Sequence, residues 1–134
     1  MPTLPWQAVE RPHDQTAVAV VMASRFRVRR FRDVPRFFFD SLRIHRQVLA
    51  AEGAFGVSLV AHPLRREFFT LSAWADRVSV NKLVSTDSHR SAMRRHHPVM
   101  AQSRFVFWEV TCGELPVTWD DSYHRLEGRA TVTN

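Results

Sequence analysis

The sequence contains little cysteine, and it contains no long apolar run. Its single cysteine, Cys112, cannot form an internal disulfide, and a buried, inert thiol is expected there. No apolar run approaches the roughly 20 residues of a membrane-spanning helix, so no membrane insertion is expected. Residues 1–14 lack the basic segment followed by an apolar one that marks a secretory signal. A cytoplasmic location is therefore expected.

Sequence motifs for several common chemistries are also missing. The chain has no glycine-rich phosphate loop, Cys-x-x-Cys pair, Gly-x-Ser-x-Gly elbow or His-Glu-x-x-His helix. These absences argue against nucleotide-binding folds, zinc sites and serine hydrolases.

The composition is that of a folded and basic protein. The 134 residues are 45% apolar, a length and composition that suit one domain with one core. The net charge is +6, and the cations are almost all arginine, with Lys82 the single lysine. Such a charge attracts nucleic acid, membrane surfaces or acidic substrates. The arginines are nevertheless spread over the chain in short groups, so nucleic acid is not an expected partner.

Hydrophobic periodicity predicts a core of strands and helices in the order βαββαβ. Asp33 and Asp76 are expected to cap the two helices. The order is that of the ferredoxin-like α+β fold with an antiparallel four-stranded sheet. The predicted strands are 17–29, 57–61, 67–74 and 105–111, and the predicted helices are 34–53 and 76–98, the second interrupted at 85–87.

The ferredoxin-like domain is expected to span residues 17–116. Residues 1–16 hold three of the seven prolines and show little periodicity, so they are expected to form an arm without a folded element. Residues 117–134 are expected to be a polar C-terminal extension with one short helix near 120–126.

The third and fourth predicted strands are apolar on both faces. The two helices cover one face of the sheet, so the other face needs a second cover. RNA-recognition domains stack bases on such a face, but residues 66–71 do not match their basic, glycine-containing motif. A homodimer packed sheet to sheet is therefore expected.

The end of the second helix is the first place to look for chemistry, because its spacing puts His89, Ala92, Met93 and His96 on one face. Three roles are open for His89. It is a helix-start residue whose ring bonds to a backbone carbonyl, a ligand of haem iron, or a group that takes part in acid–base catalysis. Ala92 and Met93 suit a core, and His96 suits a solvated helix end. His89 and His96 lie roughly 10 Å apart along the helix, too far to share one small metal ion.

Two further residues are candidate catalytic groups. His45 shares the expected inward face of the first helix with Phe38 and Leu42, and it is either a core histidine with satisfied hydrogen bonds or a group that faces a ligand. Glu109 is the one carboxylate inside an apolar strand, where burial would favour its protonated form and suit it to base catalysis. Pairing with an arginine at the strand end is the alternative.

Four sequence features resemble the dimeric α/β-barrel superfamily over about residues 17–116. They are the strand end Thr-Leu-Ser-Ala-Trp at 70–74, the helix that starts at Asp76, the element 85–93 and the closing strand 105–110. The superfamily includes antibiotic-biosynthesis and haem-degrading monooxygenases and spheroidene monooxygenase, and the likeness is closest to spheroidene monooxygenase-like proteins. The resemblance implies a homodimer with a pocket between helices and sheet in each subunit.

The resemblance also implies a monooxygenase-like enzyme that acts on an apolar or aromatic small molecule. His89 matches the spheroidene monooxygenase pattern, which implies haem bound through His89, whereas the ligand position of haem-degrading enzymes falls on Met93. Neutral imidazole is a normal proximal ligand of haem iron. Cofactor-free oxygenation of the antibiotic-biosynthesis type and non-catalytic ligand binding are the alternatives. The expected substrate pocket consists of Phe38, Leu42, Trp74, Phe105 and Phe107.

Overall fold

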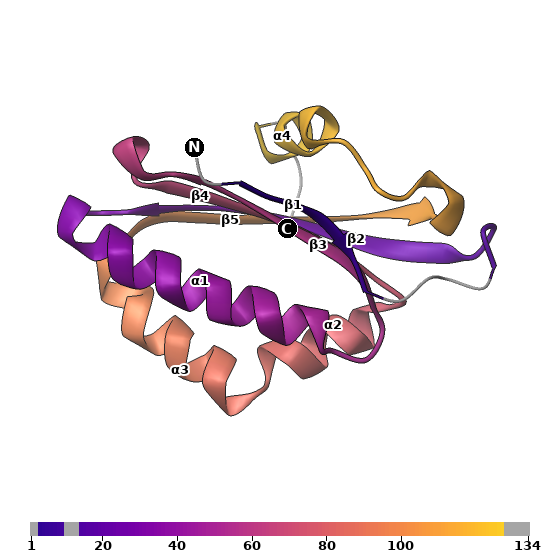
Figure 1. Ribbon diagram of the computed structural model, residues 1–134, viewed down its shortest axis with the longest axis horizontal. Helices are drawn as coiled ribbons and strands as arrows, with labels where there is room; N and C mark the ends of the chain where they lie inside the picture. Colours follow the sequence, from indigo (N-terminus) through magenta and orange to yellow (C-terminus); the bar gives the residue numbers. More distant parts are fainter. Residues whose placement is uncertain (1–2, 10–13, 128–134) are drawn as a thin grey trace.

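The computed structural model describes residues 3–9 and 14–127. One antiparallel sheet has the strand order β1-β3-β4-β2-β5, with α1, α2 and α3 on one face and α4 on the other (Figure 1). The strands are β1 Thr3–Ala8, β2 Val18–Val28, β3 Ala54–His62, β4 Glu67–Trp74 and β5 Met100–Thr111, and the helices are α1 Val34–Leu49, α2 Arg77–Val84, α3 Asp87–His96 and α4 Trp119–Glu127. The predicted ferredoxin-like α+β fold is confirmed.

The sheet has five strands rather than the predicted four, because β1 comes from the segment expected to be an arm. β1 pairs with β3 at the edge of the sheet, and the register between them shifts between Leu4 and Gln7, on either side of Pro5. Proline is tolerated in edge strands, where one side of the backbone makes no ladder hydrogen bonds. The prolines that argued against structure here are therefore compatible with an edge strand.

Trp6 of β1 packs against Gly56 of β3, and this contact can be tested. A Cβ atom on Gly56 would lie 2.2 Å from Cζ2 of Trp6. We therefore expect Gly56→Ala to lower the free energy of unfolding, near the low end of the roughly 1–3 kcal/mol range for overpacking, because an edge strand can shift. Urea denaturation measures this loss. In a Trp6→Ala background the same change should have little effect, and an equal loss in both backgrounds would contradict the contact.

The two predicted helix caps differ in outcome. Asp33 occupies the predicted N-cap position of α1, at the end of a short 3-10 turn, but its side chain makes no capping hydrogen bond. The Asp76 carboxylate accepts a hydrogen bond from the Ser79 amide at 2.8 Å, which confirms the predicted cap of α2. The predicted interruption also holds, because α2 ends at Val84 and α3 begins at Asp87.

On the helix-covered face of the sheet, the core is divided into two clusters. The first, which we call the Trp74 cluster, consists of Val48, Ala54, Val57, Trp74, Val80 and Leu83. The second, the Phe68 cluster, consists of Val28, Phe37, Ala61 and Phe68. The space between the two clusters contains the site described below.

The opposite face of the sheet, which we call the outer face, is covered in part by α4. Leu126 is buried there in one cluster with strand residues that include Val60 and Leu71, and the ring of Tyr123 lies 5.0 Å from that of Phe69. The short helix predicted near 120–126 is confirmed. The second cover that the sequence requires thus comes at least partly from the same chain, and the homodimer stays a prediction.

Candidate active site

A cavity of about 520 Å³ lies between the helices and the sheet, and residues of both helix-side clusters line it. Protein interiors are close-packed, with few voids larger than a water molecule. Cavities of this size that have mostly apolar walls and a few polar groups are typical of small-molecule sites. The gap in the core is therefore the candidate functional site.

The floor of the cavity is polar in its middle. Ser24 of β2 lies opposite Thr70 of β4, and their hydroxyls are hydrogen-bonded to each other. Ser72, two residues further along β4, accepts a hydrogen bond from Trp74 Nε1 at 2.8 Å. Alternate residues of a strand face the same side, so these three hydroxyls form one band on the cavity floor.

The roof has a matching band on α1. Asp40, Ser41 and His45 line the cavity from this helix at helical spacing. Phe37 precedes them on the same face, and Val48 follows them. The inward face of α1 therefore carries polar residues, with Ile44 among them, between two apolar ends.

Packing places the roof band over the floor band. The ring of Phe37 lies 4.7 Å from that of Phe68, which belongs to the Phe68 cluster. Val48 packs in the Trp74 cluster at the other end. Since Phe37 and Val48 are fixed at the two ends, the polar residues of α1 lie over the middle of the sheet. The cavity thus combines apolar ends with a polar centre.

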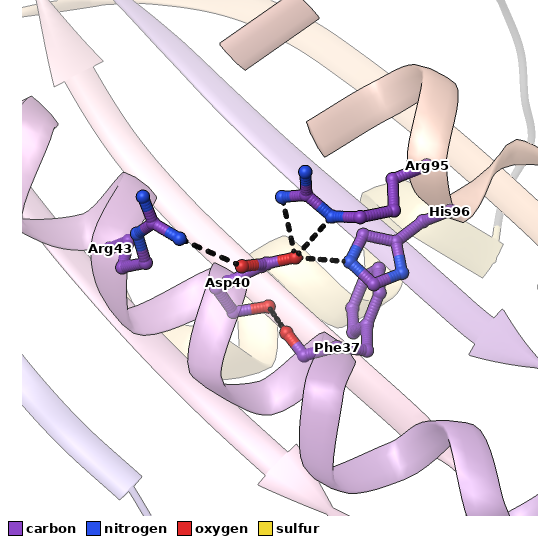
Figure 2. Close-up of polar contacts among 6 residues, drawn as sticks. Phe37, Asp40, Arg43, Arg95 and His96 are labelled. Carbon is purple, nitrogen blue, oxygen red and sulfur yellow. Dashed lines mark hydrogen bonds and ion pairs between the residues drawn. The ribbon is translucent and has the colours of Figure 1, made fainter. Parts of the chain in front are cut away.

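Asp40 joins α1 to α3 at the cavity wall (Figure 2). Its Oδ2 atom lies 2.6 Å from Nε2 of His96 and 2.9 Å from Nη2 of Arg95, and Oδ1 lies 3.6 Å from Nη1 of Arg43. Desolvation opposes ionisation of Asp40, but the hydrogen bonds and charges of His96 and Arg95 outweigh it and lower the pKa of this carboxyl below its ordinary value. Asp40 is therefore ionised at neutral pH.

Two other cavity histidines lack such a partner. His45 Nε2 and His89 Nδ1 are buried and make no hydrogen bond within the described part of the chain. Burial lowers the pKa of both imidazoles, because desolvation disfavours the charged form. Both rings are therefore neutral at pH 7. A buried polar atom without a partner is costly, which is consistent with a ligand as the missing partner.

Replacement of His45 by an apolar residue tests this interpretation. We expect His45→Leu to raise the free energy of unfolding by about 1 kcal/mol at pH 7, because it removes an unpaired buried nitrogen. The gain should grow below about pH 6.5, since the unfolded chain then binds a proton that folded His45 does not bind, and the wild-type protein loses stability as the pH falls. Urea denaturation at pH 7 and pH 5 measures both effects.

His124→Leu, on the exposed side of α4, is the matched control. It should change the stability little at either pH. A loss of stability in His45→Leu at pH 7 would show that His45 makes a stabilising contact in solution.

The structure places five of the nine predicted site residues on the cavity wall. They are His45, Trp74, His89, Met93 and Phe105. The cavity face predicted for α3 is also correct, since Ala92 and His96 line the cavity together with His89 and Met93.

The other four predicted residues do not line the cavity. Phe38 and Leu42 fall on the flank of α1, because its inward stripe is centred on Phe37, Ser41 and Val48 instead. Phe107 packs against the Trp74 cluster with the Arg77 guanidinium 3.8 Å from its ring centre. Glu109 is exposed, because β5 is an edge strand, so the expected burial of this carboxylate is wrong.

Two interpretations of the sequence change with the structure, and one residue at the cavity was not predicted. His96 is only 6% exposed and paired with Asp40, so it is not a solvated helix end. Met93 is 50% exposed and lies at the cavity wall, so it is not core. Asp40 is not among the predicted site residues, although a carboxylate three residues after Phe37, on the same helix face as His45, was a usable signal.

Within residues 3–9 and 14–127, no three His, Cys, Asp or Glu side chains come together in a metal-binding arrangement. The helices of the same ranges are too short or too polar to cross a membrane.

Several solved structures share this fold. A protein from Nitrosomonas europaea described as an antibiotic biosynthesis monooxygenase matches with a TM-score of 0.62 at 15% identity, over 80% of this chain and 99% of that one. Another antibiotic biosynthesis monooxygenase matches with a TM-score of 0.61 at 8% identity, over 69% of this chain and 98% of that one. SnoaB, a cofactor-independent oxygenase from Streptomyces nogalater, matches with a TM-score of 0.58 at 13% identity, over 69% of this chain and 92% of that one. The predicted resemblance is confirmed at the level of fold.

Sequence comparison adds no closer relationship. No protein-family model matches the chain, and no curated protein matches it either.

Proposed function

We propose that the protein is a cofactor-independent oxygenase that acts on an apolar or aromatic small molecule bound in the cavity. The observation that carries this proposal is the polar part of a mostly apolar cavity, where His45 and His89 each keep a buried nitrogen that makes no hydrogen bond within residues 3–9 and 14–127. The fold shared with SnoaB, which is described as a cofactor-independent oxygenase, supports it.

The cavity suits chemistry in which the substrate itself reacts with oxygen. A substrate with an acidic C–H group loses a proton, the resulting carbanion combines with O₂, and loss of water leaves a ketone. The overall reaction is R₂CH₂ + O₂ → R₂C=O + H₂O, with oxygen as the oxidant. The apolar ends of the cavity would hold the rings of the substrate, and the hydroxyls of Ser24, Thr70 and Ser72 would bind its oxygen atom. His45 and His89 would bind it as neutral rings.

Haem is the second candidate, because His89 lines the cavity with a neutral ring, which is the form that binds iron. A bound haem would supply an iron that activates oxygen. Ligating histidines usually donate their other ring N–H to an acceptor that orients them. His89 Nδ1 has no such acceptor within the described residues, so the residues fit haem less well than they fit an organic substrate.

Spectroscopy and oxygen uptake together test the two candidates. The purified protein should show no absorbance band near 400 nm and should gain none with added hemin. It should consume oxygen with anthrone, an apolar tricyclic compound whose CH₂ group loses a proton readily, and form anthraquinone. A hemin band that His89→Ala abolishes would favour haem instead. Binding of anthrone in a thermal-shift assay, without oxygen uptake, would favour a non-catalytic binding protein.

A homodimer, as the resemblance implies, belongs to the same proposal. Because α4 already covers part of the outer face, packing of two such faces requires α4 to move or to exchange between subunits. Light scattering of the full chain should give twice the monomer mass of 15.6 kDa. A monomeric mass at micromolar concentration would contradict the dimer.

A further inference from the structure

Four histidines line the cavity, and within the described residues His96 is the one that pairs with a carboxylate. A general base becomes positively charged when it takes a proton, so an adjacent negative charge favours the transfer. Burial lowers the pKa of His45 and His89, and no described residue supplies either ring with a charged partner. His97 is exposed. His96 is therefore the cavity histidine whose ring a carboxylate orients.

The contact with Asp40 also decides which nitrogen of His96 is basic. An ionised carboxylate only accepts hydrogen bonds, so His96 must donate to it from Nε2, which lies 2.6 Å from Oδ2. In the neutral ring the other nitrogen, Nδ1, is then the proton acceptor. This tautomer follows from the bond rather than from an observed hydrogen. Asp40 thus sets His96 in the form that a base requires.

The surroundings of Asp40 keep the pair in this state. Arg95 donates to the same carboxylate oxygen from Nε and Nη2, at 3.2 and 2.9 Å, and Arg43 approaches the other oxygen. Among the described residues, the other charged groups that reach Asp40 are these two arginines, from α3 and α1 respectively (Figure 2). Because they favour the ionised carboxylate, Asp40 does not take the His96 proton for itself.

The ring of His96 is also held in place. It lies edge-on to Phe37 with ring centres 5.0 Å apart, and Phe37 itself packs on Phe68. His96 is the last residue of α3, where the helix dipole favours a positive charge. Packing against Phe37 and the hydrogen bond to Asp40 therefore fix the orientation of the ring at this position.

We infer that His96 is the catalytic base of the cavity and that Asp40 is its positioning residue. The inference rests on the proposed oxygenase function. In the first step the proton of the substrate C–H bond moves to Nδ1 of His96, and the electron pair stays on the substrate. The carbanion then forms a C–O bond with O₂. The resulting peroxide anion takes the proton back from His96. Cleavage of the O–O bond with loss of the second C–H proton then gives the ketone, and the released hydroxide combines with that proton to form water.

The test separates proton removal from oxygen chemistry. Anthrone deuterated at its CH₂ group is incubated anaerobically with the protein, and enzyme-dependent loss of deuterium to water is followed by mass spectrometry. Oxygen uptake is measured in parallel with unlabelled anthrone, so that kcat and KM are obtained separately.

We expect His96→Gln to lower both the deuterium loss and kcat at least about 100-fold, the usual size of general-base effects, with KM changed less than about 3-fold. Asp40→Asn, which keeps an acceptor for Nε2, should lower kcat about 10-fold. Imidazole added to His96→Ala should restore part of the deuterium loss, which a purely structural role of His96 would not allow. His124→Gln, on the opposite side of the sheet, should behave like the wild-type protein.

Each remaining outcome is decisive. Unchanged deuterium loss in folded His96→Gln would overturn the inference. Deuterium loss in the wild-type protein without oxygen uptake would overturn the oxygenase function and leave the base assignment standing. Binding of anthrone without either reaction would overturn both.

Discussion

Trp74→Ala is expected to lower the free energy of unfolding by roughly 3–5 kcal/mol, the usual loss for a large buried aromatic residue. Trp74 is fully buried at the centre of the Trp74 cluster. One side of its ring borders the cavity, so water can enter part of the vacated space, and the lower half of that range is expected. A domain of this size is stable by roughly 5–15 kcal/mol, so the variant should lose a substantial part of its stability.

Urea denaturation followed by circular dichroism measures this loss. Trp74→Phe is the matched control, because it keeps an aromatic ring and removes the hydrogen bond from Nε1 to Ser72. Its loss should be roughly 1–2 kcal/mol. A loss below about 1 kcal/mol for Trp74→Ala would contradict the tight packing of this residue.

Asp40→Ala is expected to have the second largest effect on stability, roughly 3 kcal/mol at pH 7. This value lies between the roughly 1–3 kcal/mol for one buried donor left unpaired and the 3–5 kcal/mol for a broken buried ion pair. His96 is buried and would lose its partner, whereas Arg95 is about one-third exposed and can be rehydrated. Asp40→Asn should lose less, because its amide oxygen still accepts from His96.

The effect of Asp40→Ala should depend on pH in a defined direction. Since the pKa of Asp40 is lowered in the folded protein, its contribution to stability is present above the unfolded value of about 3.9 and is lost as the pH falls through the folded value. The difference between the wild-type protein and Asp40→Ala should therefore shrink between pH 5 and pH 3. Denaturation curves with the same difference at both pH values would show that the charge of Asp40 is not what stabilises the fold.

Most of the fold could be predicted from sequence because its elements have strong local signals. The apolar strands and the Asp76 cap lie where expected. β1 could not be predicted in this way, because a short strand with a proline has no periodicity of its own, and its position depends on the edge of β3. Pairing with β3, which is distant in the sequence, determines that residues 3–8 form a strand.

The candidate site was predicted less completely. His45, His89 and Trp74 face the cavity as expected, because helix and strand periods predict which side chains share a face. Phe38 and Leu42 were placed on the cavity wall because the predicted orientation of α1 differs from the observed one by a small rotation about the helix axis. Apolar residues on both flanks of the helix left this rotation undetermined by the sequence. The Asp40–His96 pair spans 56 residues. No local pattern connects the two residues, so only the three-dimensional structure could bring them together.

The placement of α4 has a consequence for how this chain could associate. α4 follows the sheet through the short linker 115–118 and fills its site on the outer face of the same chain. An identical site exists on every other copy, so two chains could exchange their α4 helices and form the same contacts between subunits. Such an exchanged dimer would differ from the monomer mainly in the path of the linker, and protein concentration would then determine which form is populated.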